Sequence, residues 1–366
     1  MIPELARVDW FRFLNRGPLP PPSACVLEAL RRERILVTGA GGSIGGALAL
    51  RLEALRPKQL VLLDAAESAL FAIQNSMRRA GADATRTSFV LGTVNDAALL
   101  EDAFAEHEPN LVFHAAAFKH VPILEEQPLA AIENNIFGTA SVLRAATRHG
   151  ARCVLLSTDK AVQPVSVLGA SKRVAEMLTL AQGAVAMRLA NVMASSDSVA
   201  EVFARQITED GAMTVTDEKA RRYFLSIDEA ADLLLAAAGV DSQPALLVPR
   251  LMQQHGIADL ARFMAAELAP GRAVRIEFTK LRPGDKESEM LWSAGEEAVE
   301  AGGMVQLNTP IPDDEALEKG LEELKAAVRE RDVAAGLDAM CALVPEYVPS
   351  AAVRRLASKD RLGAIA

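Results

Sequence analysis

Residues 34–45 read Arg-Ile-Leu-Val-Thr-Gly-Ala-Gly-Gly-Ser-Ile-Gly, and they carry the strongest indication of the fold in this sequence. An apolar run, Ile35–Val37, leads directly into a glycine-rich turn, and a segment of helical periodicity, Ile44–Leu55, follows. Glycines in such a turn permit a tight bend, close approach of the backbone to a pyrophosphate and close packing of the next helix. The N-terminus of that helix offers free N–H groups to an anion. The stretch therefore predicts a dinucleotide site, and the residues expected to form it are Gly39, Gly42, Ser43, Ile44 and Gly45.

An acidic residue follows the second apolar run at the spacing that such a site requires. Asp64 closes the run Leu60–Leu63 and lies nineteen residues beyond Gly45. A carboxylate there accepts both hydroxyls of the adenine ribose and disfavours a 2′-phosphate, so we expect NAD rather than NADP. The alternatives are a turn that binds nothing and an Asp64 that only caps its strand.

Short apolar runs alternate with helical segments from residue 34 to about residue 195. The apolar runs are Ile35–Val37, Leu60–Leu63, Ser88–Leu91, Leu111–Phe113, Cys153–Leu156 and Ala184–Leu189. Strands alternating with helices predict an α/β fold with a Rossmann-type, doubly wound parallel sheet. The alternation then weakens, and amphipathic segments at Ser198–Ile207, Ile227–Ala238 and Leu260–Ala269 indicate a smaller, mostly helical C-terminal substrate lobe.

We therefore divide the chain into four parts. Residues 1–33 are expected to be an N-terminal arm or linker with a proline cluster, and residues 34–195 the NAD-binding domain. Residues 196–312 are expected to form the substrate lobe, with some exchange of chain between the lobes. Residues 313–366 have high helix propensity and alternating charge, which predicts a solvated helical tail.

Composition excludes several classes of protein. The 366 residues are 50% hydrophobic and carry a formal net charge of −9, so we expect no nucleic-acid partner. Three cysteines without a CxxC pair argue against a disulfide framework and a zinc site, and favour a cytoplasmic location. No apolar run approaches the length of a membrane span, so we expect no membrane insertion.

Further motifs occur in order along the chain. They are His114–Pro122 with Glu126, Pro128, Asn135 and Gly138-Thr139; Ser157–Ala161; Gly169–Arg173; Arg188 with Asn191-Val192; Thr214–Asp217; Arg222–Phe224; and Leu281–Lys286. Together with the glycine turn, they resemble CapD-like polysaccharide-biosynthesis dehydratases of the extended short-chain dehydrogenase/reductase type. The resemblance runs from about Phe13 to Val344–Tyr347, nearly the whole chain. Many relatives carry membrane helices ahead of this part, so we expect a soluble short form.

The resemblance implies an NAD-dependent 4,6-dehydratase that converts UDP-N-acetylglucosamine to a 4-keto-6-deoxy sugar. It implies that Thr158 bonds near O4, Asp159 protonates the C6 oxygen and Lys160 takes the C5 proton. Lys172 would hold the nicotinamide ribose, and Ala115 and Ala116 would border the cofactor. An Asp beside a Lys is physically apt, since each charge stabilises the other and a partly desolvated lysine can titrate low enough to act as a base. The alternative is an ordinary ion pair at a strand end.

Cations are expected to bind the anionic substrate. Arg222 and Arg282 are predicted to clamp the diphosphate, because a planar guanidinium pairs with phosphate oxygens bidentately. Lys119, His120 and Asn191 would support the sugar or phosphate contacts. We expect no metal, since His114 and His120 straddle a predicted strand end and are better suited to packing or capping than to ligating a metal.

The chain also departs from the family pattern. Leu168 stands where the wider superfamily has the tyrosine that removes the C4 hydroxyl proton, and Thr93 replaces an expected Asp. Ala190, Ala194 and Asp197 stand where glycines are usual, which places a Cβ or a charge where close approach is normal. Two alternatives stay open: an epimerase of UDP-sugars, and a nucleotide-binding homologue without activity. The resemblance also implies a homo-oligomer.

Overall fold

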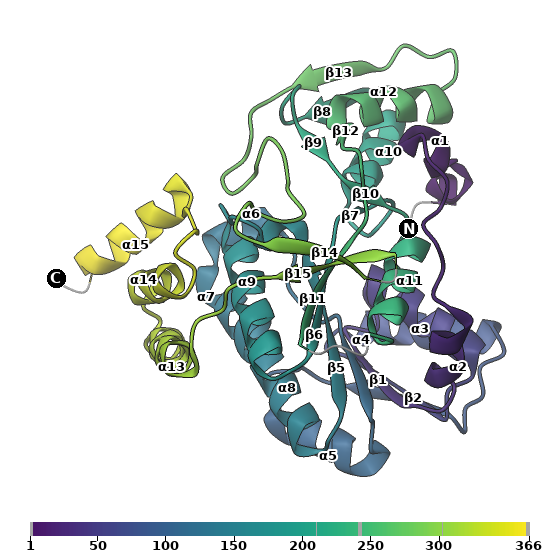
Figure 1. The fold of residues 1–366 in the computed structure, drawn as a ribbon. Coiled ribbons are helices and arrows are strands. Elements are labelled where there is room, and N and C mark those ends of the chain that lie inside the picture. Colours follow the sequence, from purple (N-terminus) through teal and green to yellow (C-terminus); the bar gives the residue numbers. More distant parts are fainter. Residues whose placement is uncertain (1–2, 210, 241–243, 302, 364–366) are drawn as a thin grey trace.

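The computed structural model describes residues 3–209, 211–240, 244–301 and 303–363. Within them lies a nine-stranded central sheet (Figure 1) of order β14-β15-β11-β6-β5-β4-β1-β2-β3. The strands are β1 (Arg34–Thr38), β2 (Gln59–Asp64), β3 (Thr87–Leu91), β4 (Leu111–His114), β5 (Arg152–Thr158), β6 (Val185–Leu189), β11 (Ala245–Pro249), β14 (Glu297–Ala301) and β15 (Met304–Asn308). Neighbours from β3 to β11 pair in parallel, whereas β15 and β14 are added antiparallel at one edge. The predicted α/β doubly wound fold is confirmed.

Strand alternation sends side chains into two apolar layers, one on each face of the sheet. Leu36 faces one core, while Ile35 and Val37 of the same strand face the other. The first face is covered by α5 (Ala97–His107), α8 (Gly138–Arg148) and α9 (Val167–Ala181). The second face is covered by α2 (Ala24–Leu30), α3 (Ser43–Leu55), α4 (Glu67–Arg79) and α11 (Ile227–Ala237). Between β4 and α8 the chain forms α6 (Val121–Glu126), α7 (Pro128–Ala131) and the π-helix η2 (Ile132–Phe137).

The smaller lobe lies above the carboxyl ends of the strands (Figure 1). Its helices are α10 (Val199–Glu209) and α12 (Ile257–Leu268), and its strand pairs are β7 (Asn191–Val192) with β10 (Phe224–Leu225), β8 (Ala212–Val215) with β13 (Arg275–Phe278), and β9 (Arg221–Arg222) with β12 (His255–Gly256). The predicted division of the chain at residue 195 stays a prediction. Three strands from the later range, β11, β14 and β15, lie in the central sheet and not in the smaller lobe.

The N-terminal arm packs on this smaller lobe. It comprises η1 (Pro3–Arg7) and α1 (Trp10–Leu14), and Leu14 is buried in the lobe's apolar core. The Phe13 ring lies 5.3 Å from that of Phe263, and an ion pair joins Arg16 to Glu229. The arm is thus fixed to its own chain. Residues 1–2 of the predicted arm and 364–366 of the predicted tail lie outside the described residues.

The C-terminal segment forms α13 (Asp314–Glu330), α14 (Val333–Leu343) and α15 (Ala351–Gly363). The sequence predicts a solvated helical tail, but this helical segment is not solvated all round. Leu324 and Met340 are fully buried in the same core as α8 and α9, because one face of each helix is apolar.

Candidate active site

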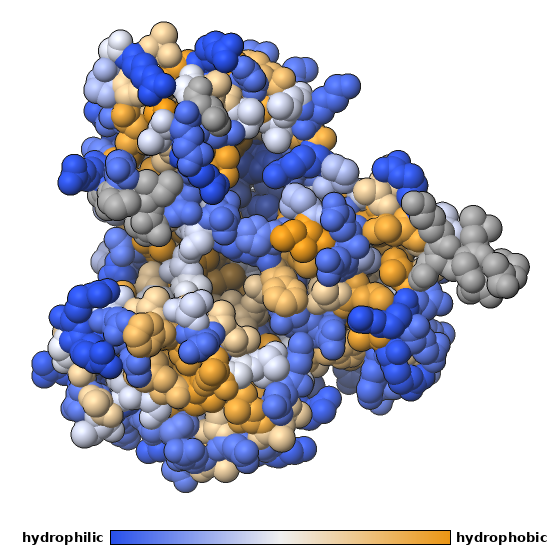
Figure 2. All heavy atoms as spheres, turned by 180° about the vertical axis from the view of Figure 1, so that it is seen from behind, coloured by the Kyte–Doolittle hydropathy of each residue, from blue (hydrophilic) through white to orange (hydrophobic). Residues whose placement is uncertain are grey.

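A cavity of about 730 Å³ opens at the carboxyl ends of the strands, beside the point where the strand order reverses between β1 and β4. Open α/β sheets place their ligands at this point. The face shown in Figure 2 is hollowed between the two lobes. The lining of the cavity includes these predicted residues: Gly39, Gly42, Ser43, Ile44, Gly45, Ala115, Lys119, His120, Thr158, Lys160, Lys172 and Asn191. Residues separated by 150 positions in the sequence are therefore brought to one cavity.

The glycine turn has the close packing that its sequence implies. A Cβ on Gly45 would lie 2.1 Å from the backbone oxygen of Gly39, and one on Gly39 would lie 2.6 Å from the nitrogen of Ala116. The φ of Gly39 is +69°, which a residue with a side chain adopts only at a cost. Asp64 accepts hydrogen bonds from the nitrogens of Gly41 at 2.8 Å and Ala66 at 2.9 Å. The Asp64 carboxylate is thereby held beside the turn at the end of β2.

Polar side chains gather where β5 ends and the short helix η3 (Asp159–Ala161) begins. Lys160 Nζ donates to Asp159 Oδ1 at 3.0 Å and to Asn191 Oδ1 at 3.2 Å. Thr158 donates its hydroxyl to Asp159 Oδ1 at 3.0 Å. Asp159 is fully buried, whereas Thr158 and Lys160 border the cavity. An acid, an amine and a hydroxyl thus converge within hydrogen-bonding distance at one strand end.

The electrostatics of this pair differ in part from the prediction. Burial raises the pKa of Asp159, although the Lys160 ammonium opposes the shift, so the acid holds its proton more readily than an exposed Asp. Burial lowers the pKa of Lys160, but Asp159 and Glu289 outweigh burial and leave that pKa above its ordinary value. The expectation of a lysine that titrates low was wrong, because two carboxylates stabilise its charge.

Lys172 presents a buried cation to the cavity. It is 3% exposed, and among the described residues no hydrogen bond or ion pair involves its ammonium group. Burial lowers the pKa of Lys172 to about 8 against the opposing charge of Glu176. Leu168 lies one helical turn earlier in α9 and also lines the cavity. An unpaired buried donor at this place suits a ligand that accepts its hydrogen bonds.

His114 is committed to the protein interior. Its two ring nitrogens contact the hydroxyls of Thr38 at 2.7 Å and Thr139 at 3.0 Å. Burial, and then the cation of Lys172, lower the pKa of His114 to about 3, so the ring is neutral. His120 lies instead at the exposed rim, with Nε2 3.7 Å from a carboxylate oxygen of Asp197.

The segment after β7 reaches across to the glycine turn. The backbone nitrogen of Ser196 donates to the hydroxyl of Ser43 at 2.9 Å, and Lys119 Nζ donates to the carbonyl of Ser196 at 2.5 Å. Ala194 and Asp197 both have a φ of +55°, the left-handed region that favours glycine. Of the three positions where glycine is usual, these two therefore carry backbone strain beside the cavity.

The two predicted diphosphate clamps lie outside the cavity lining. Arg222 donates to the backbone carbonyls of Arg221 at 2.8 Å and Lys286 at 2.7 Å. Arg282 forms an ion pair with Asp285 at 2.9 Å and is otherwise exposed. Their role in substrate binding stays a prediction. Glu289 was not among the predicted site residues; its one signal in the sequence is an acid three residues after Lys286 and directly before the apolar Met290-Leu291-Trp292.

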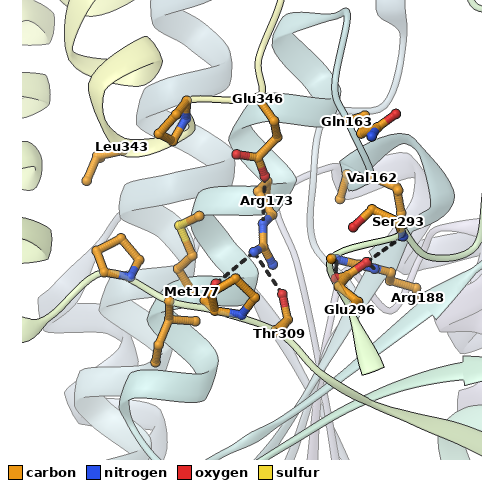
Figure 3. A pocket seen from close by; sticks show the side chains of 16 residues that line it. Val162, Gln163, Arg173, Met177, Arg188, Ser293, Glu296, Thr309, Leu343 and Glu346 are labelled. Carbon is orange, nitrogen blue, oxygen red and sulfur yellow. Dashed lines mark hydrogen bonds and ion pairs between the residues drawn. The ribbon is translucent and has the colours of Figure 1, made fainter. Parts of the chain in front are cut away.

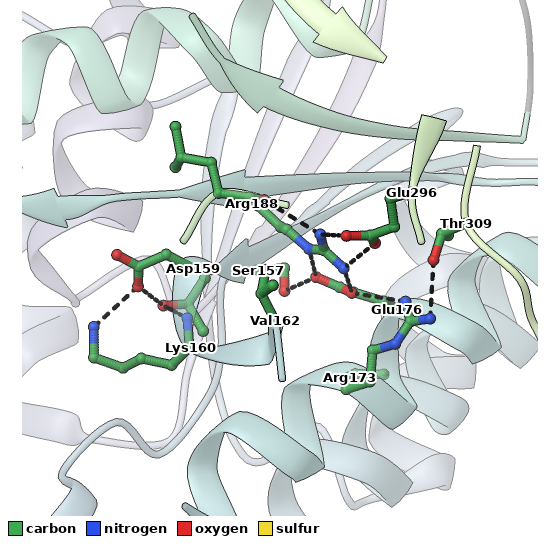
Figure 4. A network of polar contacts seen from close by, with 12 residues as sticks. Ser157, Asp159, Lys160, Val162, Arg173, Glu176, Arg188, Glu296 and Thr309 are labelled. Atoms are coloured by element: carbon green, nitrogen blue, oxygen red, sulfur yellow. Dashed lines mark hydrogen bonds and ion pairs between the residues drawn. The ribbon is translucent and has the colours of Figure 1, made fainter. Parts of the chain in front are cut away.

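A buried ionic network supports the strand that carries the acid and the amine (Figure 4). Ser157 donates its hydroxyl to Glu176 at 2.7 Å, and Glu176 accepts two bonds of 2.8 Å from Arg188. Arg188 also pairs with Glu296 at 2.9 Å, and Arg173 pairs with Glu176 at 3.3 Å. The network joins β5, β6, α9 and the segment before β14, so it fixes the end of β5 relative to α9.

A second cavity, of about 400 Å³, borders this network on the side of the C-terminal helices (Figure 3). Arg173 spans it, since its guanidinium contacts Glu346 at 3.3 Å, the hydroxyl of Thr309 at 2.9 Å and the carbonyl of Pro310 at 3.0 Å. With these partners, Arg173 ties the C-terminal segment to α9.

Comparison with known proteins gives a consistent family. Residues 35–305 match the family described as "Polysaccharide biosynthesis protein". The chain is 35% identical to the probable polysaccharide biosynthesis protein EpsC of Bacillus subtilis (77% of this chain, 49% of that protein) and 34% identical to the capsular polysaccharide biosynthesis protein CapD of Staphylococcus aureus (80% and 50%). It is 32% identical to a UDP-glucose 4-epimerase of Rickettsia bellii (72% and 79%). The chain thus spans about half the length of the first two relatives.

Solved structures share the fold. Pen from Bacillus thuringiensis superposes with a TM-score of 0.71 at 26% identity, covering 78% of this chain and 89% of that one. DesIV of Streptomyces venezuelae, a dTDP-glucose 4,6-dehydratase solved with NAD bound, has a TM-score of 0.62 at 19% identity, covering 70% and 87%. In the part of the chain that the structure describes, no helix combines the length and apolar character needed to cross a bilayer.

Proposed function

The chain belongs to the polysaccharide biosynthesis protein family, and from this premise we propose that it catalyses the NAD-dependent 4,6-dehydration of a UDP-N-acetylhexosamine. UDP-N-acetylglucosamine is the substrate that we expect, and the product would be a 4-keto-6-deoxy sugar nucleotide used for a surface polysaccharide. The observation that carries the proposal is the group Thr158, Asp159 and Lys160, which meets at the end of β5 beside the cavity that the glycine turn also lines.

The residues present fit NAD. The glycine turn and the N-terminus of α3 would hold the pyrophosphate, Asp64 would accept the adenine ribose hydroxyls, and Lys172 supplies an unpaired buried donor for the nicotinamide ribose. Bound NAD would accept hydride from C4 while the C4 hydroxyl proton leaves to water, and it would return the hydride to C6 while C5 takes up a proton.

The Asp159–Lys160 pair can supply the two proton transfers that eliminate water across C5 and C6. A shift of the lysine proton across the 3.0 Å hydrogen bond converts ammonium and carboxylate into a neutral amine and a neutral acid. The raised pKa of Asp159 reduces the cost of that shift, whereas the raised pKa of Lys160, to which the Glu289 carboxylate contributes, opposes it. Lys160 would then take the C5 proton, while Asp159 protonates the C6 oxygen and the C6–O bond breaks to release water. The pair would end as the ion pair from which it began.

A product assay tests the proposal. The protein is incubated with UDP-N-acetylglucosamine and the nucleotide sugar is followed by mass, where loss of one water indicates dehydration. Asp159→Asn and Lys160→Ala are each expected to lower turnover at least about a hundredfold, since each removes one proton-transfer group. Cofactor content and thermal unfolding of both variants serve as controls for folding. Undiminished turnover in both variants would remove the mechanism.

A second candidate is epimerisation of a UDP-sugar, which uses the same transient oxidation. The similarity to the Rickettsia epimerase, of which the chain covers 79%, favours it. A new stereoisomer of unchanged mass in the same assay would select it. The acid paired with an amine at the end of β5 favours dehydration, because loss of the C6 hydroxyl needs an acid in addition to a base.

A further inference from the structure

Glu289 is a buried carboxylate that reaches the proposed reacting groups from a different part of the chain. It lies between β13 and β14, and its side chain is 3% exposed. Its Oε1 atom lies 3.9 Å from Lys160 Nζ, and its Oε2 atom lies 3.1 Å from Lys286 Nζ. Burying a carboxylate is costly unless the charge is paired, and two lysines pair with Glu289.

The segment that carries Glu289 is fixed against the end of β5. Lys286 Nζ donates to the carbonyl of Val162 at 2.6 Å, just beyond η3. Arg222 donates to the carbonyl of Lys286 at 2.7 Å, which attaches the segment to β9. The smaller lobe is thereby joined to the end of β5 through Glu289 and the two lysines that pair with it, Lys160 and Lys286.

The charges around Lys160 are unequal. Two carboxylates, those of Asp159 and Glu289, face its ammonium, while the neutral amide of Asn191 accepts a hydrogen bond from it and Arg222 is the opposing cation nearby. Glu289 is shared with Lys286, whose ammonium lies 3.1 Å from its other oxygen. Its carboxylate is available to the Lys160 ammonium that forms when Lys160 takes the C5 proton while Asp159 is still protonated.

We infer that Glu289 is a positioning residue for Lys160, holding its ammonium group against Asp159 and linking the Lys286–Glu289 segment to the reaction. The inference deepens the proposed dehydration and rests on it for its catalytic consequence. When Lys160 takes the C5 proton and becomes an ammonium, the Glu289 carboxylate stabilises the charge that forms. Glu289 itself exchanges no proton with the sugar.

The test that does not need turnover is chemical labelling of Lys160. Only the neutral amine reacts with an acylating reagent such as acetic anhydride, so the labelling rate at a fixed pH follows the fraction of lysine that is neutral. Glu289→Gln keeps the shape but removes the charge, and should accelerate acylation of Lys160 about tenfold, which corresponds to a pKa lower by about one unit. The rate is read from the Lys160 peptide by mass spectrometry, with the Lys119 peptide as internal reference.

Two further variants serve as controls. Glu289→Asp retains the charge and should restore slow labelling, which a purely steric role would not do. Glu287→Gln removes an exposed carboxylate of the same segment and should leave the labelling of Lys160 unchanged. Thermal unfolding shows whether each variant is folded before it is labelled.

In the dehydration assay, Glu289→Gln should lower kcat about tenfold with little change in KM. It should also shift the falling limb of the kcat–pH profile, where the pair loses the Lys160 proton, about one unit to lower pH. The two readouts separate the two proposals. Faster labelling without any turnover in the native protein would refute the dehydratase and support the role of Glu289. Equal labelling of Lys160 in the native protein and Glu289→Gln would overturn the inference, even if the protein dehydrates its substrate.

Discussion

Replacing Arg188 by Met should destabilise the whole protein through the network beneath β5. Arg188 is 1% exposed and pairs with Glu176 and Glu296 at 2.8 and 2.9 Å. Met has a similar length but no charge, so Arg188→Met leaves the Glu176 carboxylate with Arg173 as its remaining cation, at 3.3 Å. The substitution removes paired charges without opening a large cavity, so its effect reports mainly on electrostatics.

The magnitude follows from the burial of the pair. Removing one partner of a buried ion pair costs about 3–5 kcal/mol. Unfolding entropy of about 2.1 cal/mol/K per residue gives about 0.8 kcal/mol/K for 366 residues, so Tm should fall by about 4–6 °C. Glu176→Gln together with Arg188→Met should cost less than the sum of the two single substitutions, because the acid has then been removed with its cation.

The pH dependence of the Tm difference shows whether the loss of stability comes from the unpaired Glu176 carboxylate. In the native protein burial raises the pKa of Glu176, but Arg188 and its other partners outweigh burial and hold that pKa below its ordinary value. The stabilisation from this pairing is present above the carboxyl pKa of the unfolded chain and is lost as pH falls through the folded value. In Arg188→Met, burial is opposed by fewer cations, so protonation relieves the penalty. The Tm difference between the two proteins should therefore shrink as pH is lowered from neutral toward about 5.

Differential scanning calorimetry over that pH range, with the double substitution as control, measures both effects. An Arg188→Met protein that unfolds within about 1 °C of the native protein, or a Tm difference that stays constant with pH, would contradict the electrostatic role of Arg188.

Three further changes have distinct expected results. Gly45→Ala should lower the free energy of unfolding by about 1–3 kcal/mol and weaken cofactor binding, since its Cβ would lie 2.1 Å from a backbone oxygen. Gly46→Ala is the control and should be tolerated, because its Cβ would lie 3.4 Å from the nearest atom. Thermal unfolding and cofactor retention are measured for both variants. Lys172→Met should abolish NAD binding, measured by calorimetry, and should raise the Tm of the protein without cofactor. Burial lowers the pKa of Lys172 to about 8 and so penalises this cation in the folded state; the Tm gain should vanish above the ordinary lysine pKa. Asp197→Gly relieves a φ of +55° and removes a rim carboxylate, so it should raise both Tm and the affinity for UDP; an unchanged UDP affinity would place Asp197 away from the diphosphate.

Local sequence predicted the elements that form the Rossmann-type sheet. Each of the six apolar runs predicted as a strand is a strand, because a parallel strand buried on both faces reads as a continuous apolar segment. Glycine spacing located the turn, since a side chain at Gly39 or Gly45 has no room. The motif at Thr158–Lys160 located an acid and an amine that do meet. These features depend on neighbouring residues, so they are visible in the sequence.

The interactions between charged side chains could not be predicted from the sequence, because they depend on the folded arrangement. Glu289 lies 129 positions after Lys160, and no spacing rule relates them, yet its charge helps to raise the pKa that sequence reasoning expected to be low. Arg222 contacts backbone carbonyls because its neighbours in space come from the Lys286 segment. Electrostatic energy depends on distance and burial between groups that folding brings together, and the order of residues along the chain specifies neither.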